Sequence, residues 1–192
     1  KAIDEGSNIN FIFDELIKNK NTISSKYVLM TYYNILSAYG EKLFLDKCDE
    51  AGVYGLIIPD LPYELTKKFK KEFYHHSVKI ISLIAMTASD ARIMQIAKNS
   101  EGFIYTVTMN ATTGNSGEFH PDLKRKIEYI KKVSKIPVVA GFGIKNPEHV
   151  KDIASVADGI VIGSEIVKRI EIDSRKEFIT YIKSIRTALN SF

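Results

Sequence analysis

The chain has 192 residues, of which 45% are hydrophobic and 26% charged, and its formal net charge is +4. This is the size and composition of one soluble globular domain with a sizeable core. No apolar stretch is long enough to cross a bilayer, and the lysines are spread out rather than clustered, which argues against membrane or nucleic-acid binding. The single cysteine, Cys48, excludes an internal disulfide and favours a reducing, cytoplasmic environment.

Short apolar runs alternate with amphipathic helical patterns along the chain. The runs are largely continuous rather than alternating, which is typical of strands buried on both faces of a parallel sheet. A helix capped by Ser7 or Asn8 precedes the first strand, and a helical pattern follows each strand. One of these helices begins at Asn146-Pro147, a capping side chain followed by proline. In chain order, the predicted strands are 27–33, 55–58, 78–84, 103–107, 136–140 and 159–162.

Two glycine elements follow the last two predicted strands, Gly141-Phe142-Gly143 and Gly163-Ser164. Backbone amides approach a phosphate closely only where no side chain intervenes, and the helix that opens near Ser164 adds N–H donors and a favourable dipole. A (β/α)8 barrel builds its phosphate pocket in this way after strands seven and eight. The pair therefore favours a TIM barrel over an open doubly wound sheet, whose glycine-rich turn would follow the first strand.

The chain is short for a closed barrel, which typically needs about 250 residues. It also opens at Lys1 within a polar helical pattern. We therefore expect an α/β fold that is an incomplete barrel. It would be a single TIM-barrel domain over residues 1–192, lacking its first two β/α units and carrying strands 3 to 8 with their helices.

Residues at the predicted strand ends are candidates for the mouth of the barrel. Tyr32 and Tyr105 are either working residues or core tyrosines whose hydroxyl groups bind the backbone. Asp60 is either a mouth carboxylate or a side chain that braces its own loop. Phe142 is either a wall for an aromatic substrate or ordinary barrel packing.

The segment 110–119, rich in Gly, Asn, Ser and Thr, has no core pattern and is typical of an active-site lid. Gly114 in this segment would add an amide to the phosphate site. No metal is expected, because the histidines lack metal-ligand spacing. His75 and His76 close a helix, where we expect both to be solvated. Lys79 lies at the wrong end of its strand for Schiff-base chemistry.

Five short motifs occur in order from near Lys1 to the end of the chain. They are Leu29–Asn34, Gly52–Pro62, Gly102–Tyr105 with Thr112-Thr113-Gly114, Gly141–Ile144, and Gly163–Val167. Each motif alone is modest, but the ordered set resembles the α subunit of tryptophan synthase. The resemblance covers that family from just after its second strand onward.

The resemblance implies a lyase of tryptophan biosynthesis that cleaves indole-3-glycerol phosphate to indole and glyceraldehyde 3-phosphate. This retro-aldol reaction needs no metal or cofactor, but an acid must protonate the indole and a base must accept a hydroxyl proton. The family uses a Glu and an Asp that would both lie upstream of Lys1. The resemblance also implies a β subunit that carries pyridoxal phosphate, within an α2β2 tetramer.

Residue by residue, the resemblance implies a binding shell. The predicted phosphate ligands are Gly114, Gly143, Gly163 and Ser164. The predicted indole pocket is Met30, Tyr32, Leu83 and Phe142. Tyr105 and Thr113 would support the catalytic pair, and the predicted partner surface is Asn34, Ile35, Asp60 and Pro62.

Two alternatives stay open at this point. One is another phosphate-binding barrel, such as a sugar-phosphate isomerase or epimerase, although the aromatic residues at the mouth argue against a sugar site. The other is a non-catalytic fragment that only binds phosphate or its partner.

Overall fold

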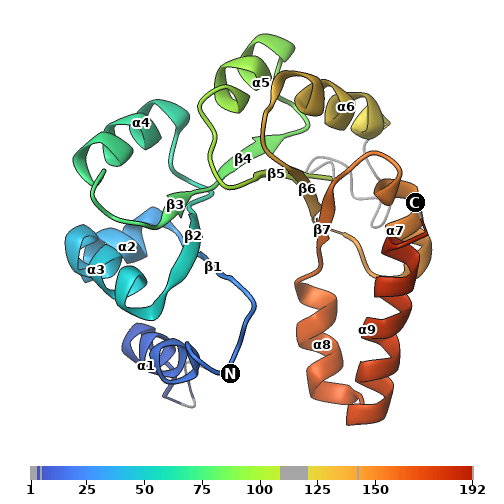
Figure 1. Cartoon of the computed structure of the whole chain (residues 1–192), viewed down its shortest axis with the longest axis horizontal. Helices are drawn as coiled ribbons and strands as arrows, with labels where there is room; N and C mark the ends of the chain where they lie inside the picture. The colour runs from blue at the N-terminus through green and yellow to red at the C-terminus, as the bar shows by residue number, and fades with distance from the viewer. Residues whose placement is uncertain (1–3, 5, 109–120, 142, 192) are drawn as a thin grey trace. The chain divides into compact units, whose positions relative to one another are not determined.

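The computed structural model describes residues 4, 6–108, 121–141 and 143–191. The chain forms two compact units, Lys1–Ile81 and Ser82–Phe192, and each is described here by itself. In both units parallel strands alternate with helices, as the sequence pattern predicts (Figure 1).

The first unit contains a parallel three-stranded sheet in the order β1-β2-β3. Helix α3 ends at Gly52, whose φ of 70° is the left-handed conformation that glycine adopts without strain. The elements are α1 (Ile9–Asn19), β1 (Tyr27–Met30), α2 (Tyr33–Tyr39), α3 (Glu41–Ala51), β2 (Val53–Ile57), α4 (Tyr63–Glu72) and β3 (Lys79–Ile80).

An aromatic cluster joins the helices of this unit. Phe13 of α1 packs edge-on against Phe44 of α3, with ring centroids 5.1 Å apart, and Tyr39 of α2 contacts both rings. Cys48 is fully buried in the same core, as predicted, and burial raises the pKa of its thiol to about 12. The thiol is therefore a packing group that stays protonated at neutral pH.

The second unit contains a parallel four-stranded sheet in the order β4-β5-β6-β7. Helices α5 and α6 pack against each other, and α7 packs against α9. The elements are β4 (Ser82–Ala85), α5 (Asp90–Ala97), β5 (Ile104–Val107), α6 (Leu123–Val133), β6 (Val138–Gly141), α7 (Pro147–Ala154), β7 (Gly159–Val161), α8 (Ser164–Ile172) and α9 (Arg175–Leu189).

The predicted helix starts are confirmed where a capping side chain marks them. Asn8 accepts a hydrogen bond from the amide of Phe11, and Asn146 accepts one from the amide of His149, with Pro147 in the first helical position. None of the helices in the described part of the chain is long and apolar enough to span a bilayer.

Two predicted strands are wrong in extent. The run 27–33 pairs only as far as Met30, because Tyr32 then caps the unpredicted helix α2, which buries Leu36. The run 78–84 is divided between two sheets. Lys79–Ile80 pairs with β2, whereas Ser82–Ala85 pairs with β5.

The prediction that His76 is solvated is wrong. Its side chain is only 3% exposed, and Nδ1 lies 2.6 Å from Oδ2 of Asp49 on α3. Asp49 also accepts hydrogen bonds from the amide and the hydroxyl of Ser77. This network ties the end of α3 to the segment that enters β3.

A buried cation joins α6 to the turn after β4. Lys126 is 8% exposed, and its ammonium group donates to the carbonyl oxygens of Met86 and Ala88, the latter at 2.8 Å. The neighbouring Arg125 is exposed and lies 3.6 Å from Asp90. Carbonyl dipoles thus replace the water that the Lys126 ammonium loses on burial.

We expect Lys126→Met to lower the free energy of unfolding by about 1–3 kcal/mol, because two buried carbonyl groups lose their donor. Arg125→Met is the matched control, since exposed ion pairs contribute at most about 1 kcal/mol. Urea denaturation of the full-length protein measures both changes. Equal effects of the two substitutions would contradict the role assigned to Lys126.

Stability should also depend on the ionisation of Asp49. Burial acts to raise the pKa of this carboxyl, but hydrogen bonds from Ser77 and His76 outweigh it and hold the pKa below its ordinary value. The stabilisation is therefore present above the unfolded pKa, near 4, and is lost as the pH falls through the lower folded pKa.

We accordingly expect Asp49→Ala to destabilise the protein by about 1–2 kcal/mol at pH 7. The difference from the parent should shrink as the pH falls below about 4. Glu50→Ala, which removes only a surface pair with Lys47, is the control. Unfolding curves at a series of pH values would refute the assignment if the Asp49 effect were independent of pH.

Candidate functional site

The second unit brings several predicted site residues to one edge of its sheet. Leu83 of β4 pairs in register with Tyr105 of β5, and Tyr105 pairs with Val139 of β6. Residues in register share a face of the sheet, so Leu83 and Tyr105 lie side by side. The glycine elements then follow β6 and β7 at the carboxyl ends of these parallel strands, where barrel enzymes place their sites.

Tyr105 lies against Gly141. Its side chain is almost fully buried, and a Cβ atom built on Gly141 would overlap the tyrosine ring. Burial raises the pKa of the Tyr105 phenol, so the hydroxyl stays neutral at physiological pH. Gly141 is therefore required by close packing against an aromatic ring, in addition to any role at the mouth of the site.

Two threonines join the ends of β5 and β6, a feature that the sequence did not reveal. Thr106 donates its hydroxyl to the carbonyl of Val139 at 3.1 Å, and Thr108 donates to the carbonyl of Gly141 at 2.7 Å. Both residues are fully buried. These bonds supplement the backbone ladder where the chain enters the first glycine element.

Gly143 has a backbone conformation that favours glycine. Its φ is 77°, and its carbonyl oxygen lies 3.1 Å from Nδ1 of His149 on α7. Most L-residues would be strained at this φ. The turn after β6 is therefore held from α7 as well as by its own conformation.

Gly163 is the N-cap of α8, and Ser164 is the first residue of the helix. The side chains of this segment form no capping hydrogen bond, and a Cβ atom on Gly163 would meet only open space. The first amides of α8 thus face an accessible region, as anion binding at a helix N-terminus requires.

The remaining described candidates belong to the first unit. Met30 ends β1 and Tyr32 caps α2, and both side chains are more than half exposed. Asn34 and Ile35 lie in the first turn of α2, and Pro62 precedes α4 as its N-cap.

The sequence left two roles open for Asp60, a carboxylate at the mouth or a side chain that braces a loop. The structure shows a bracing hydrogen bond. Oδ1 of Asp60 accepts a hydrogen bond from the amide of Tyr33 at 2.9 Å. The hydroxyl of Tyr33 in turn donates to Glu41. The loops that follow β1 and β2 are therefore tied together by Asp60.

Three predicted site residues, Thr113, Gly114 and Phe142, lie outside the described residues. Within the described ranges, no group of three or more His, Cys, Asp or Glu side chains is placed to hold a metal ion. The described geometry thus offers backbone amides for an anion at the start of α8. In the same sheet, Leu83 and Tyr105 form an apolar and aromatic pair.

The sequence matches the family model of the tryptophan synthase alpha chain over residues 1–190. It is 98% identical over 190 residues to the tryptophan synthase alpha chain of Staphylococcus epidermidis, covering 99% of this chain and 78% of that protein. It is 60% identical over 191 residues to the corresponding chain of Staphylococcus aureus, covering 100% of this chain and 79% of that one.

Solved structures agree with the sequence comparison. The tryptophan synthase subunit alpha of Campylobacter jejuni superposes with a TM-score of 0.83 at 29% identity, covering 96% of this chain and 73% of that one. A chain from the tryptophan synthase α2β2 complex of Pyrococcus furiosus gives a TM-score of 0.84 at 29% identity, covering 100% of this chain and 77% of that one.

These neighbours are TIM barrels, so the predicted fold class is confirmed. The family match spans nearly the whole chain, and the resemblance drawn from the ordered motifs is likewise confirmed. The chain belongs to the tryptophan synthase alpha chain family.

Proposed function

We propose residue roles by which this chain carries out the lyase reaction of its family, the cleavage of indole-3-glycerol phosphate to indole and glyceraldehyde 3-phosphate. In this proposal the amides of Gly143, Gly163 and Ser164 bind the substrate phosphate. Their position after β6 and β7, with open space before Gly163, is the observation that supports it. Gly114 would contribute a further amide.

The indole ring would pack against the sheet face that Leu83 and Tyr105 share in the second unit. The family resemblance also assigns Met30, Tyr32 and Phe142 to indole binding. A buried, neutral Tyr105 hydroxyl suits a hydrogen-bonding role beside an aromatic substrate. We assign Tyr105 and Thr113 to support of the catalytic pair.

We assign the catalytic Glu and Asp of the family to no residue of this chain. Asp60 is not proposed as a substitute, because its carboxylate is engaged by the amide of Tyr33. The family match supplies no support for a sugar-phosphate isomerase or epimerase, the alternative left open by the sequence.

We also propose a β subunit as partner and a cytoplasmic location. The Pyrococcus furiosus neighbour was solved as an α2β2 complex. The surface that would meet a β subunit consists of Asn34, Ile35, Asp60 and Pro62. The Asp60 hydrogen bond ties the start of α2 to the loop after β2 on this surface. Pyridoxal phosphate would then belong to the partner, and this chain would carry no cofactor.

Ser164→Asp tests the phosphate assignment. A carboxylate at the start of α8 would repel the phosphate, so we expect KM for indole-3-glycerol phosphate to rise at least about tenfold, a loss of about 1.4 kcal/mol. Lys124→Gln, on the exposed surface of α6, makes the net charge more negative by the same amount and is the control. Steady-state kinetics of the full-length protein with its β subunit decide the matter. An unchanged KM in Ser164→Asp would refute the site.

Gly141→Ala tests the packing of Tyr105 at the site. The added methyl group would displace the tyrosine ring, so we expect a loss of about 1–3 kcal/mol in stability and a lower kcat/KM. Gly159→Ala is the matched control on the adjacent strand, since its Cβ would meet Val139 at 3.5 Å, an ordinary contact. Equal behaviour of the two variants in thermal melts and kinetics would contradict the packing argument.

A further inference from the structure

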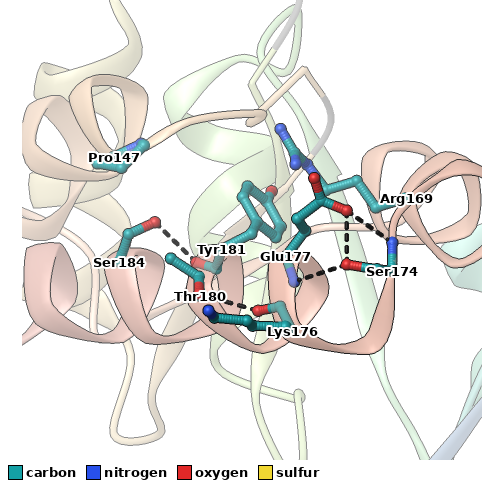
Figure 2. Close-up of a pocket in the computed structure, with 8 residues that line it drawn as sticks. All are labelled: Pro147, Arg169, Ser174, Lys176, Glu177, Thr180, Tyr181 and Ser184. Carbon is teal, nitrogen blue, oxygen red and sulfur yellow. Dashed lines mark hydrogen bonds between the residues drawn. The ribbon is translucent and has the colours of Figure 1, made fainter.

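A groove of about 650 Å³ lies among residues of α7, α8 and α9 and the segment that joins α8 to α9 (Figure 2). Most of its lining side chains are polar. The full set of lining residues is Pro147, Arg169, Ser174, Lys176, Glu177, Thr180, Tyr181 and Ser184. The groove carries two cationic side chains, the exposed Lys176 and the deeper Arg169, so its first interpretation is a second anion site centred on Arg169.

The contacts of Arg169 argue against that interpretation. Its Nε donates to Glu165 at 2.8 Å, and its Nη1 donates to Asp173 at 3.0 Å. Both carboxylates are mostly buried, at 16% and 13% exposed. The guanidinium group therefore has two carboxylate partners within its own helix and its C-cap, and its charge is already balanced.

The same guanidinium group lies over the ring of Tyr181, with Cζ 4.0 Å from the ring centroid. Such stacking is favourable because the ring face is electron-rich. Arg169 is bonded to Glu165 in the first turn of α8 and to Asp173 at its C-cap. The contact between Arg169 and Tyr181 therefore connects α8 to α9.

The hydroxyl of Tyr181 makes the second connection. Tyr181 is 7% exposed, and its Oη donates to the carbonyl oxygen of Lys145 at 2.9 Å. Lys145 lies two residues after Gly143, in the turn between β6 and α7. One side chain on α9 thus contacts the turn that carries Gly143 and, through Arg169, the helix that begins at Ser164.

We propose that Tyr181 is a positioning residue that sets the separation between the Gly143 turn and the N-terminus of α8, so that amides from both can bind one phosphate. This inference rests on the proposed phosphate site. Binding by amides from two segments demands a fixed distance between them. The β6–β7 ladder pairs Gly141 with Val161 and ends there, before Gly143 and Ser164 are reached. Tyr181 meets this need from outside the site, without touching the substrate.

Tyr181→Phe removes the bond to Lys145 and the hydroxyl's interaction with Arg169, and it keeps the ring under Arg169. We expect KM for indole-3-glycerol phosphate to rise about fivefold, the effect of losing one neutral hydrogen bond, with kcat nearly unchanged. The affinity for free indole, which has no phosphate, should stay the same. Thr180→Ala is the control, because Thr180 lines the same groove but donates only to Lys176 within its own helix.

A double-variant cycle gives a second readout. Arg169→Lys keeps the positive charge but removes the planar stack, so it should also raise KM. If Arg169 and Tyr181 act in series, the double variant should be no worse than the more severe single variant. Strict additivity of the two effects would overturn the proposal.

The Ser164→Asp and Tyr181→Phe variants together separate the positioning role of Tyr181 from the phosphate site itself. A raised KM in Ser164→Asp together with an unchanged KM in Tyr181→Phe would overturn only the positioning role of Tyr181. An unchanged KM in Ser164→Asp would overturn both the phosphate site and the positioning role of Tyr181. A proportional loss of indole and substrate affinity in Tyr181→Phe would show a general structural role and would also overturn the proposal.

Discussion

The parallel register of β4, β5, β6 and β7 is the constraint on which the site in the second unit depends. Parallel pairing brings the carboxyl ends of these strands to one edge, so Leu83 lies beside Tyr105, and Tyr105 packs against Gly141, although they are far apart in sequence. Backbone bonds alone leave the ends of a sheet free to fray. The hydroxyl groups of Thr106 and Thr108 add donors at the end where the chain turns into the site.

Features written in local sequence could be predicted. Asn8 and Asn146 cap their helices because a side-chain oxygen bonds an amide three residues on, which needs no distant partner. The glycine elements were equally readable, since a left-handed Gly143 and an uncapped start of α8 are local backbone properties. The ordered motifs then identified the family, because their order and spacing carry more information than any one of them.

Features that depend on distant partners could not be predicted. A lysine in an amphipathic helix is ordinarily solvated, and only the fold shows that Lys126 meets the carbonyl oxygens of Met86 and Ala88. His76 follows the end of α4, and its burial depends on Asp49 of α3, which lies beside it. The run 78–84 was divided because its pairing partner changes from β2 to β5, and periodicity within one run contains no information about partners.

The start of α8 poses an electrostatic problem that its partners resolve. Glu165 in the first turn suits the helix dipole, but its charge lies one residue from Ser164, where a phosphate would bind. An unpaired carboxylate there would repel a dianion. Arg169 pairs with Glu165 at 2.8 Å, and its stack on Tyr181 keeps the guanidinium group in place. The contact that we propose to position α8 therefore also screens the carboxylate next to Ser164, so one arginine–tyrosine pair bears on both the position and the charge of this helix start.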